Sequence, residues 1–104
     1  MANPKVGDGY LNNRVGPVLR ASPITAGVIE AAEVDNPNKT IRVDDKIAYV
    51  RIDTDGEMIL RRETLERALG RPFRMSELEV NLGSFAGRIE TTDDFVRFYY
   101  EKTL

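Results

Sequence analysis

The spacing of apolar residues divides the chain into strand-like and helix-like stretches. Residues 15–20 carry apolar side chains at alternate positions, which predicts a strand. We place this strand at a sheet edge because Pro17 has no backbone N–H to donate. A helix is predicted next, since Ser22 suits the N-cap and Pro23 suits the first helical position. The helix ends before Pro37. Its apolar face consists of Ile24, Val28, Ala31 and Ala32.

After residue 40 the apolar positions recur every second residue, which predicts three successive strands. These strands cover residues 41–44, 48–52 and 58–61. Asp44 and Asp45 are placed to form the turn between the first two. Asp55 and Gly56 form a strong hairpin signal, so we expect a β-hairpin that leads into the third strand.

Helical spacing returns at residues 62–69. Glu63 and Arg67 lie one helical turn apart and are expected to form an ion pair. Gly70 suits the left-handed position that follows a helix. The apolar face of this helix consists of Leu65, Ala68 and Leu69.

A second, shorter helix is predicted directly afterwards. Ser76 and Glu79 have the spacing of a capping box, and Met75 and Val80 have the spacing of the hydrophobic staple that accompanies it. Gly83 is placed to end this helix.

Two strands complete the chain, at residues 85–90 and 95–101. The last strand is expected to face the core on one side and to be partly covered on the other. The resulting order, β-α-β-β-β-α-α-β-β, predicts an α+β domain with mainly antiparallel sheets and three helices. At 104 residues the chain is long enough for one domain. We place this domain at residues 13–104, after a flexible tail at residues 1–12.

Composition excludes several classes of partner. With 15 basic and 17 acidic residues the net charge is −2, so no nucleic-acid partner is implied. The longest apolar stretches are far shorter than a membrane span, which argues against a membrane partner. The first ten residues lack the basic start and apolar run of a secretory signal. We therefore expect a cytoplasmic protein.

The chain contains no cysteine and no histidine. This excludes disulfides, thiolate and imidazole metal ligands, and the most common general base. A di-iron site of the helix-bundle type needs two Glu-x-x-His pairs, which this chain cannot supply. Any redox chemistry in which the chain takes part must therefore reside in another protein.

The remaining polar groups are weak candidates for catalysis. Asp44 and Asp45, like Asp93 and Asp94, are adjacent in sequence, and adjacent residues of a strand point to opposite faces. Such a pair cannot flank one reacting bond, and in a turn it is ordinary solvated polarity. No base is placed to activate Ser84 as a nucleophile.

The stretch NLGSFAGR, from Asn81 to Arg88, is the strongest candidate for a binding surface. On local grounds a helix-to-strand turn explains Gly83, and a strand bend or bulge explains Gly87. Phe85 is left unexplained as a large apolar side chain among small ones. Small residues let a second backbone approach closely, and one aromatic group among them suits an anchor in a partner's pocket.

The chain resembles the effector, or coupling, proteins of bacterial multicomponent di-iron monooxygenases, and most closely those of toluene monooxygenases. The resemblance is carried by NNRVGPVLRA, VIEAAEVDNP, AYVRIDTDGEMILRRETLERALGRPF, ELEVNLGSFAGRIE and RFYYEKT. It implies a cofactorless, non-catalytic regulatory protein that docks on the di-iron hydroxylase. There the protein would couple NADH-derived electrons and O2 activation to hydroxylation of the substrate.

The resemblance also implies which residues lie against the hydroxylase. They are Asn81, Gly83, Ser84, Phe85, Gly87 and Arg88. We expect the free protein to be monomeric. Two alternatives stay open from the residues alone, a generic protein-binding module and a small carboxylate-based enzyme.

Overall fold

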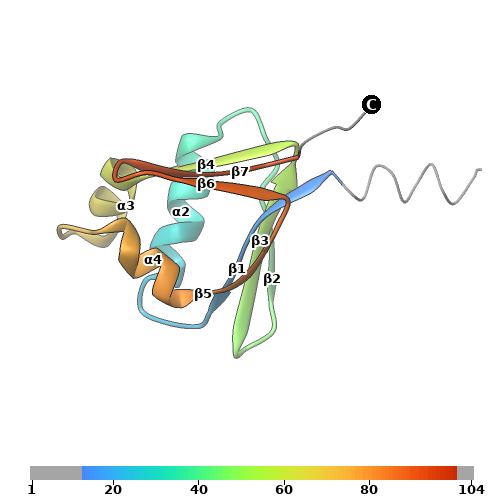
Figure 1. The fold of residues 1–104 in the computed structure, drawn as a ribbon. Helices are drawn as coiled ribbons and strands as arrows, with labels where there is room; N and C mark the ends of the chain where they lie inside the picture. The colour runs from blue at the N-terminus through green and yellow to red at the C-terminus, as the bar shows by residue number, and fades with distance from the viewer. Residues whose placement is uncertain (1–12, 101–104) are drawn as a thin grey trace, which may run out of the picture.

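Two antiparallel sheets and three helices make up residues 13–100, the part of the chain that this computed structural model describes (Figure 1). The tail expected at residues 1–12 lies outside the described residues. In chain order the elements are β1 (Arg14–Arg20), α2 (Thr25–Asp35), β2 (Arg42–Asp45), β3 (Tyr49–Asp55), β4 (Glu57–Arg61), α3 (Arg62–Leu69), α4 (Met75–Asn81), β5 (Leu82–Ala86), β6 (Arg88–Thr91) and β7 (Phe95–Tyr99).

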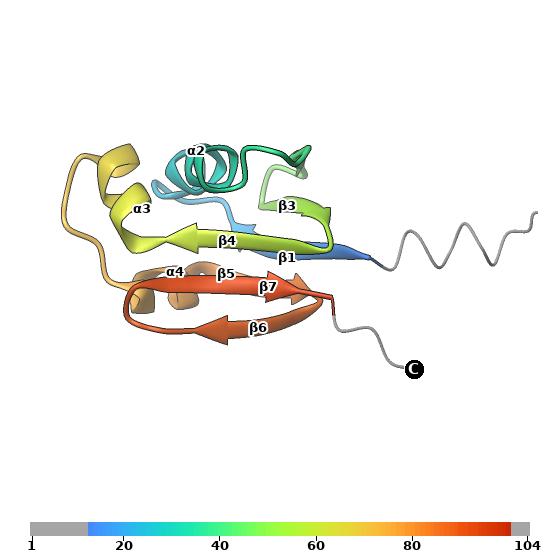
Figure 2. The ribbon, with the colours of Figure 1, turned by 90° about the horizontal axis from the view of Figure 1, so that it is seen from above.

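The strands form a four-stranded sheet in the order β2-β3-β1-β5 and a three-stranded sheet in the order β4-β7-β6. All neighbouring strands are antiparallel. Figure 2 shows β4, β7 and β6 side by side, with α2 and α3 beyond β4. The predicted α+β class with mainly antiparallel sheets is confirmed. The single strand predicted at residues 85–90 is divided into β5 and β6, which belong to different sheets.

One apolar core joins the two sheets to the helices. Val15 from β1, Val28 from α2 and Phe98 from β7 are all fully buried in it. The helices approach closely at Gly27, where a Cβ would lie 2.6 Å from Cδ2 of Leu69. The predicted apolar face of α2 is confirmed, because all of its members are buried: Ile24, Val28, Ala31 and Ala32.

The expectation that β1 is an edge strand is wrong. β1 lies between β3 and β5, although it contains Pro17. Pairing with β3 includes Val15 and Val18, and between them the described register has no paired positions. Gly16 there has a φ of +141°, and a Cβ on it would lie 2.1 Å from the carbonyl oxygen of Ile52. The hydrogen-bond ladder between β1 and β3 is thus interrupted beside Pro17. Because no N–H is needed there, an interior strand can contain this proline.

The predicted hairpin at Asp55 and Gly56 is also wrong, because this turn joins β3 and β4, which lie in different sheets. Gly56 adopts a φ of +85°. Its N–H donates to the carbonyl oxygen of Asn13 at 2.8 Å, and its carbonyl oxygen accepts from the N–H of Tyr100 at 2.9 Å. The positive φ that favours a hairpin here serves a corner between the sheets.

The turn between β2 and β3 begins two residues later than predicted. Asp44 and Asp45 are still part of β2, and residues 46–48 form the turn. Oδ1 of Asp45 accepts a hydrogen bond from the N–H of Ile47 at 2.7 Å. The carboxylate therefore supports the turn from the end of the strand, as aspartate side chains commonly do.

Two helix starts differ from the prediction. α2 begins at Thr25 rather than Pro23, and Ser22 forms a preceding turn in which its Oγ accepts from the N–H of Ile24 at 3.3 Å. α4 begins at Met75, so Ser76 lies inside the helix and is not its N-cap.

The start of α4 is held by Glu77, whose carboxylate accepts from the N–H of Arg74 at 3.1 Å. The predicted hydrophobic staple does not form, because Val80 is 71% exposed. Gly83 does not end the helix either. Leu82 has an extended backbone directly after Asn81, and Gly83 lies inside β5.

The other helix ends agree with the prediction. α2 ends at Asp35, ahead of Pro37. α3 ends at Leu69, and the Gly70 that follows it has a φ of +71° and donates its N–H to the carbonyl oxygen of Glu66. Arg67 and Glu63 form the predicted ion pair at 2.9 Å.

Candidate functional site

The predicted segment from Asn81 to Arg88 runs along the edge of the four-stranded sheet. α4 ends at Asn81, whose Nδ2 donates to the carbonyl oxygen of Glu77 at 2.9 Å. β5 follows at once and pairs with β1 on one side only, because it is the last strand in the sheet order. The segment therefore presents a strand edge as well as a sheet face.

The outer face of the four-stranded sheet is set by its register. Ser84 of β5 pairs with Val18 of β1, and Val18 pairs with Arg51 of β3, so their side chains share one face. Their neighbours on the other face, including Leu19 and Val50, are buried in the core. Figure 1 shows the helices on the core side of this sheet. We call the outer face around these residues the outer sheet face.

Gly83 lies on the outer sheet face beside an aromatic ring. The register between β1 and β5 shifts between Val18 and Leu19, opposite Gly83. A Cβ on Gly83 would lie 3.2 Å from Cε1 of Tyr49 and 3.4 Å from the carbonyl oxygen of Val18. The space in front of Gly83 is therefore limited mainly by the ring of Tyr49, which is 46% exposed.

Gly87 is the point at which the chain leaves one sheet for the other. It has a φ of +88°, and a Cβ on it would lie 2.7 Å from Cγ1 of Val15 and 2.8 Å from the carbonyl oxygen of Tyr99. Only glycine fits such a position without moving backbone. The predicted strand bend at Gly87 is confirmed, and it connects β5 to β6, which begins at Arg88.

Phe85 points away from the outer sheet face. It pairs with Pro17, and its ring centroid lies 6.0 Å from that of Phe98 in the core. The side chain is 40% exposed. Phe85 is thus partly a core residue, and only its exposed part is available to a partner.

The structure divides the predicted site residues among three positions. Gly83 and Ser84 lie on the outer sheet face, Phe85 lies on the opposite side of β5, and Gly87 lies at the crossing between the sheets. Sequence reasoning missed Tyr49. Its alternation with the buried Val50 and Ile52 was the signal that could have placed it on an outer face.

One carboxylate of each candidate catalytic pair forms an ion pair with a neighbouring basic side chain. Asp44 pairs with Lys46 at 3.6 Å, and Asp94 pairs with Arg62 at 3.1 Å. Within the described residues, no group of three or more potential ligands could hold a metal ion.

The pKa shifts of Glu77 and Arg62 are explained by hydrogen bonds within the protein. A hydrogen bond from Arg71, followed by the N–H of Arg74, lowers the pKa of the Glu77 carboxyl. The pKa of Arg62 is raised, first by its hydrogen bond to Asp94. Both shifts favour the charged forms that already exist at neutral pH, so they prepare neither group for proton transfer.

The two faces of β7 differ in burial. Val96 and Phe98 are buried, while Phe95, Arg97 and Tyr99 are half-buried, as predicted for the two faces of this strand. The Arg97 guanidinium lies 4.0 Å from the centroid of the Tyr99 ring and pairs with Glu57. One face of the Tyr99 ring is therefore covered by a side chain of the protein itself.

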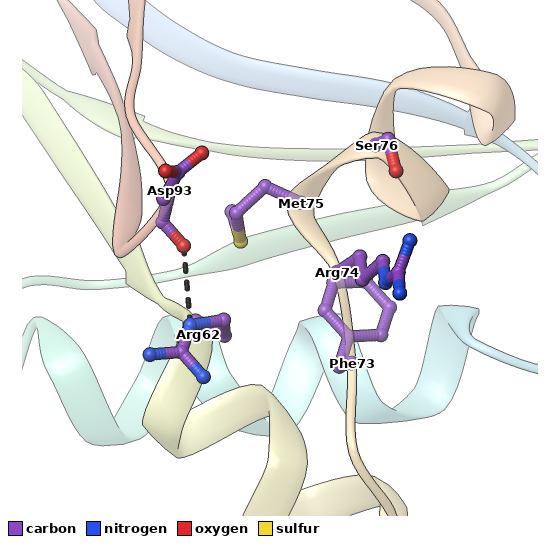
Figure 3. A pocket seen from close by; sticks show the side chains of 6 residues that line it. All are labelled: Arg62, Phe73, Arg74, Met75, Ser76 and Asp93. Atoms are coloured by element: carbon purple, nitrogen blue, oxygen red, sulfur yellow. Dashed lines mark hydrogen bonds between the residues drawn. The ribbon is translucent and has the colours of Figure 1, made fainter.

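A pocket with a volume of about 340 Å³ lies between the start of α3, the loop before α4 and the β6–β7 turn. Figure 3 shows the side chains that line it. Arg62 lies at one side of it and donates from Nε to the carbonyl oxygen of Asp93 at 3.1 Å. Phe73 and Met75 form its apolar wall and are nearly buried. The pocket contains no nucleophile beside a base, so it does not support a catalytic role.

Within residues 13–100, no helix combines the length and the apolar character needed to cross a membrane.

Comparison with known proteins agrees with this architecture. Residues 13–99 match the profile of the MmoB/DmpM family, which spans nearly the whole described chain. The chain belongs to the MmoB/DmpM family. It is 42% identical to the effector subunit of an alkene monooxygenase system from Xanthobacter autotrophicus (strain ATCC BAA-1158 / Py2), over 97% of this chain and 99% of that protein. It is 34% identical to the stimulatory component DmpM of phenol 2-monooxygenase from Pseudomonas sp. (strain CF600), over 71% of this chain and 78% of that protein.

Solved structures of this family share the fold. A phenol hydroxylase–regulatory protein complex contains a chain with a TM-score of 0.70 and 27% identity, over 85% of this chain and 99% of that chain. The soluble methane monooxygenase regulatory protein B has a TM-score of 0.65 and 26% identity, over 86% of this chain and 66% of that chain. These relatives are effector, stimulatory or regulatory components, which confirms the prediction of a non-catalytic member of this family.

Proposed function

We propose that this MmoB/DmpM family member binds the di-iron hydroxylase of a bacterial multicomponent monooxygenase in the cytoplasm. It carries no cofactor of its own there and couples NADH-derived electrons and O2 activation to hydroxylation of an aromatic hydrocarbon of the toluene type. The family membership supports the regulatory role, and the phenol hydroxylase complex supports a hydroxylase as the partner.

The observation that carries the choice of surface is the position of β5. It is an edge strand, and its outer face carries Gly83 and Ser84, whose small size leaves room for a second backbone. We assign the contact with the hydroxylase to Asn81, Gly83, Ser84, Phe85, Gly87 and Arg88.

A protein without a reactive centre acts on an enzyme through differential affinity. It shifts the hydroxylase between two states only by binding one of them more tightly. By linkage, the state of the hydroxylase, including its redox state, must change the affinity for the effector by the same factor. Oxidised and reduced hydroxylase are therefore expected to bind this chain with different Kd values.

The surface is tested by adding bulk where it cannot disturb the core. Ser84→Arg places a large charged side chain on the outer sheet face, and we expect it to weaken binding about 10-fold or more and to lower the product formed per NADH. Thr91→Arg makes the matched change at an exposed position of β6, in the other sheet, and leaves both quantities unchanged. Equal behaviour of the two variants in a reconstituted assay, with both folded, would reject this surface.

An alkene is the second candidate substrate for the partner hydroxylase. The alkene monooxygenase effector is 42% identical over 97% of this chain, whereas the phenol monooxygenase component is 34% identical over 71%. To distinguish the two candidate substrates, the turnover of toluene is compared with that of propene by the hydroxylase encoded beside this chain. The aromatic assignment requires that toluene be the better substrate, and faster turnover of propene would replace it.

A further inference from the structure

The tip of the β2–β3 hairpin carries a side chain in an unusual backbone conformation. Ile47 has a φ of +73° and is the only residue other than glycine with a positive φ among residues 13–100. The N–H of Ala48 donates to the carbonyl oxygen of Lys46 at 2.9 Å, which closes a three-residue γ-turn around Ile47. A γ-turn with a positive φ is rare and strained, and a β-branched side chain increases the strain.

Ile47 gains nothing from burial in the free protein. It is 87% exposed, more than any other large apolar side chain of the described residues. Glycine or asparagine would adopt this backbone with less strain and would expose no aliphatic surface to water. The fold of the isolated chain therefore does not explain why an isoleucine stands here.

The turn holds this side chain in a defined place. Asp45 accepts from the N–H of Ile47 at 2.7 Å, and the N–H of Lys46 donates to the carbonyl oxygen of Tyr49 at 2.8 Å. Lys46 also pairs with Asp44 at 3.6 Å. Because the turn is already ordered, a partner that buries the isoleucine orders little new backbone.

The hairpin tip continues the outer sheet face. Figure 1 shows the β2–β3 turn at the lower end of the molecule, beyond the start of β5. Tyr49, next to the turn, reaches across to Gly83. Arg20 pairs with Tyr49 in the register, and Arg51 lies further along the same face. Within the described part of the chain, no ion pair of 4.0 Å or less involves Arg20 or Arg51. Arg20 donates to the carbonyl oxygen of Val80 at 3.4 Å, and Asp44 stands opposite Arg51 in the register of β2 and β3.

We infer that Ile47 is an apolar anchor that inserts into a pocket of aliphatic and aromatic side chains on the hydroxylase surface, bordered by carboxylates that meet Arg20 and Arg51. This inference rests on the proposed function, because the hydroxylase is the occupant. An apolar side chain buried at the centre of an interface, with charges at its rim, is the usual arrangement of a binding hot spot.

The experiment compares three variants by their affinity for the hydroxylase encoded beside this chain and by their thermal stability. Ile47→Asn removes the aliphatic side chain and relaxes the backbone, so we expect binding about 10- to 100-fold weaker together with a Tm about 2–5 °C higher. Ile47→Leu keeps an apolar group and is expected to bind within about threefold of wild type. Val34→Asn, the matched change at an exposed aliphatic residue of α2, leaves the affinity unchanged.

A rise in Tm combined with a loss of affinity is the decisive result, since a purely structural role would lower both. Binding of Ile47→Asn within about threefold of wild type would overturn the anchor while leaving the proposed function intact. A lower Tm for Ile47→Asn would overturn the argument from backbone strain. If wild-type protein neither binds nor stimulates the hydroxylase, the proposed function fails first, and the anchor fails with it.

Discussion

Gly83 and Gly87 belong to the same short segment, and the structure gives them different roles. Gly87 has a positive φ, and the missing Cβ would collide with Val15 and with the backbone of Tyr99. Gly83 lies in β5 at the register shift without a positive φ, and its nearest obstacle is the half-exposed ring of Tyr49. One glycine is required by the fold, whereas the other leaves a surface open. The sequence pattern around them is similar, so only the spatial neighbours separate the two roles.

Matched alanine variants give the largest difference between the two glycines. Gly87→Ala forces a left-handed backbone on alanine and pushes its Cβ against Val15, so we expect a loss of about 2–4 kcal/mol in the free energy of unfolding. Gly83→Ala is expected to stay within about 1 kcal/mol of wild type, because Tyr49 can move and the unfolded chain loses entropy. Urea denaturation of both variants measures these values. Equal losses at the two positions would contradict the assignment of different roles.

A larger substitution at Gly83 separates stability from activity. Gly83→Val should fold with a stability within about 1–2 kcal/mol of wild type, since the nearest obstacle to a side chain there is the half-exposed ring of Tyr49. In the reconstituted assay we expect it to lower turnover and the product formed per NADH, because its side chain stands between the outer sheet face and the partner. A folded Gly83→Val variant with wild-type coupling would show that the space at Gly83 is not used for docking.

The smallest effect concerns the helix that leads into Gly83. The hydrogen bond from Arg71 lowers the pKa of the exposed Glu77 carboxyl below its ordinary value of 4.5. The carboxylate therefore stabilises the folded chain above that pH, and its contribution is lost as the pH falls through the folded pKa. We expect Glu77→Gln to have a slightly lower Tm than wild type at pH 7, and this difference to shrink below pH 4. A difference in Tm that is independent of pH would contradict this role of the carboxylate.

Local signals in the sequence predicted the elements better than their arrangement. Nearby residues alone predict the apolar face of α2, the left-handed Gly70 after α3 and the bend at Gly87. The structure confirms all three. A positive φ serves a hairpin and a corner equally well, so the local signal at Gly56 does not distinguish the two structures. The choice between them depends on hydrogen bonds to Asn13 and Tyr100, which lie far away in the chain.

In the candidate site, too, local sequence signals did not determine which residues lie side by side in space. The glycine pattern indicated the segment, yet it did not show that Phe85 turns towards Phe98 or that Tyr49 borders Gly83. The positive φ of Ile47 was not predictable either, since β-branched residues rarely adopt this backbone conformation. Such departures from local preference are held by the surrounding structure, and they are where functional surfaces are often found.

The most direct test is the ratio of product formed to NADH consumed by the hydroxylase and its electron-transfer partners, measured as wild-type chain is added. The account predicts that this ratio and the turnover rate rise together and reach a plateau once the hydroxylase sites are saturated. A hydroxylase that turned over equally fast, with the same yield per NADH, whether or not this chain was present would contradict it.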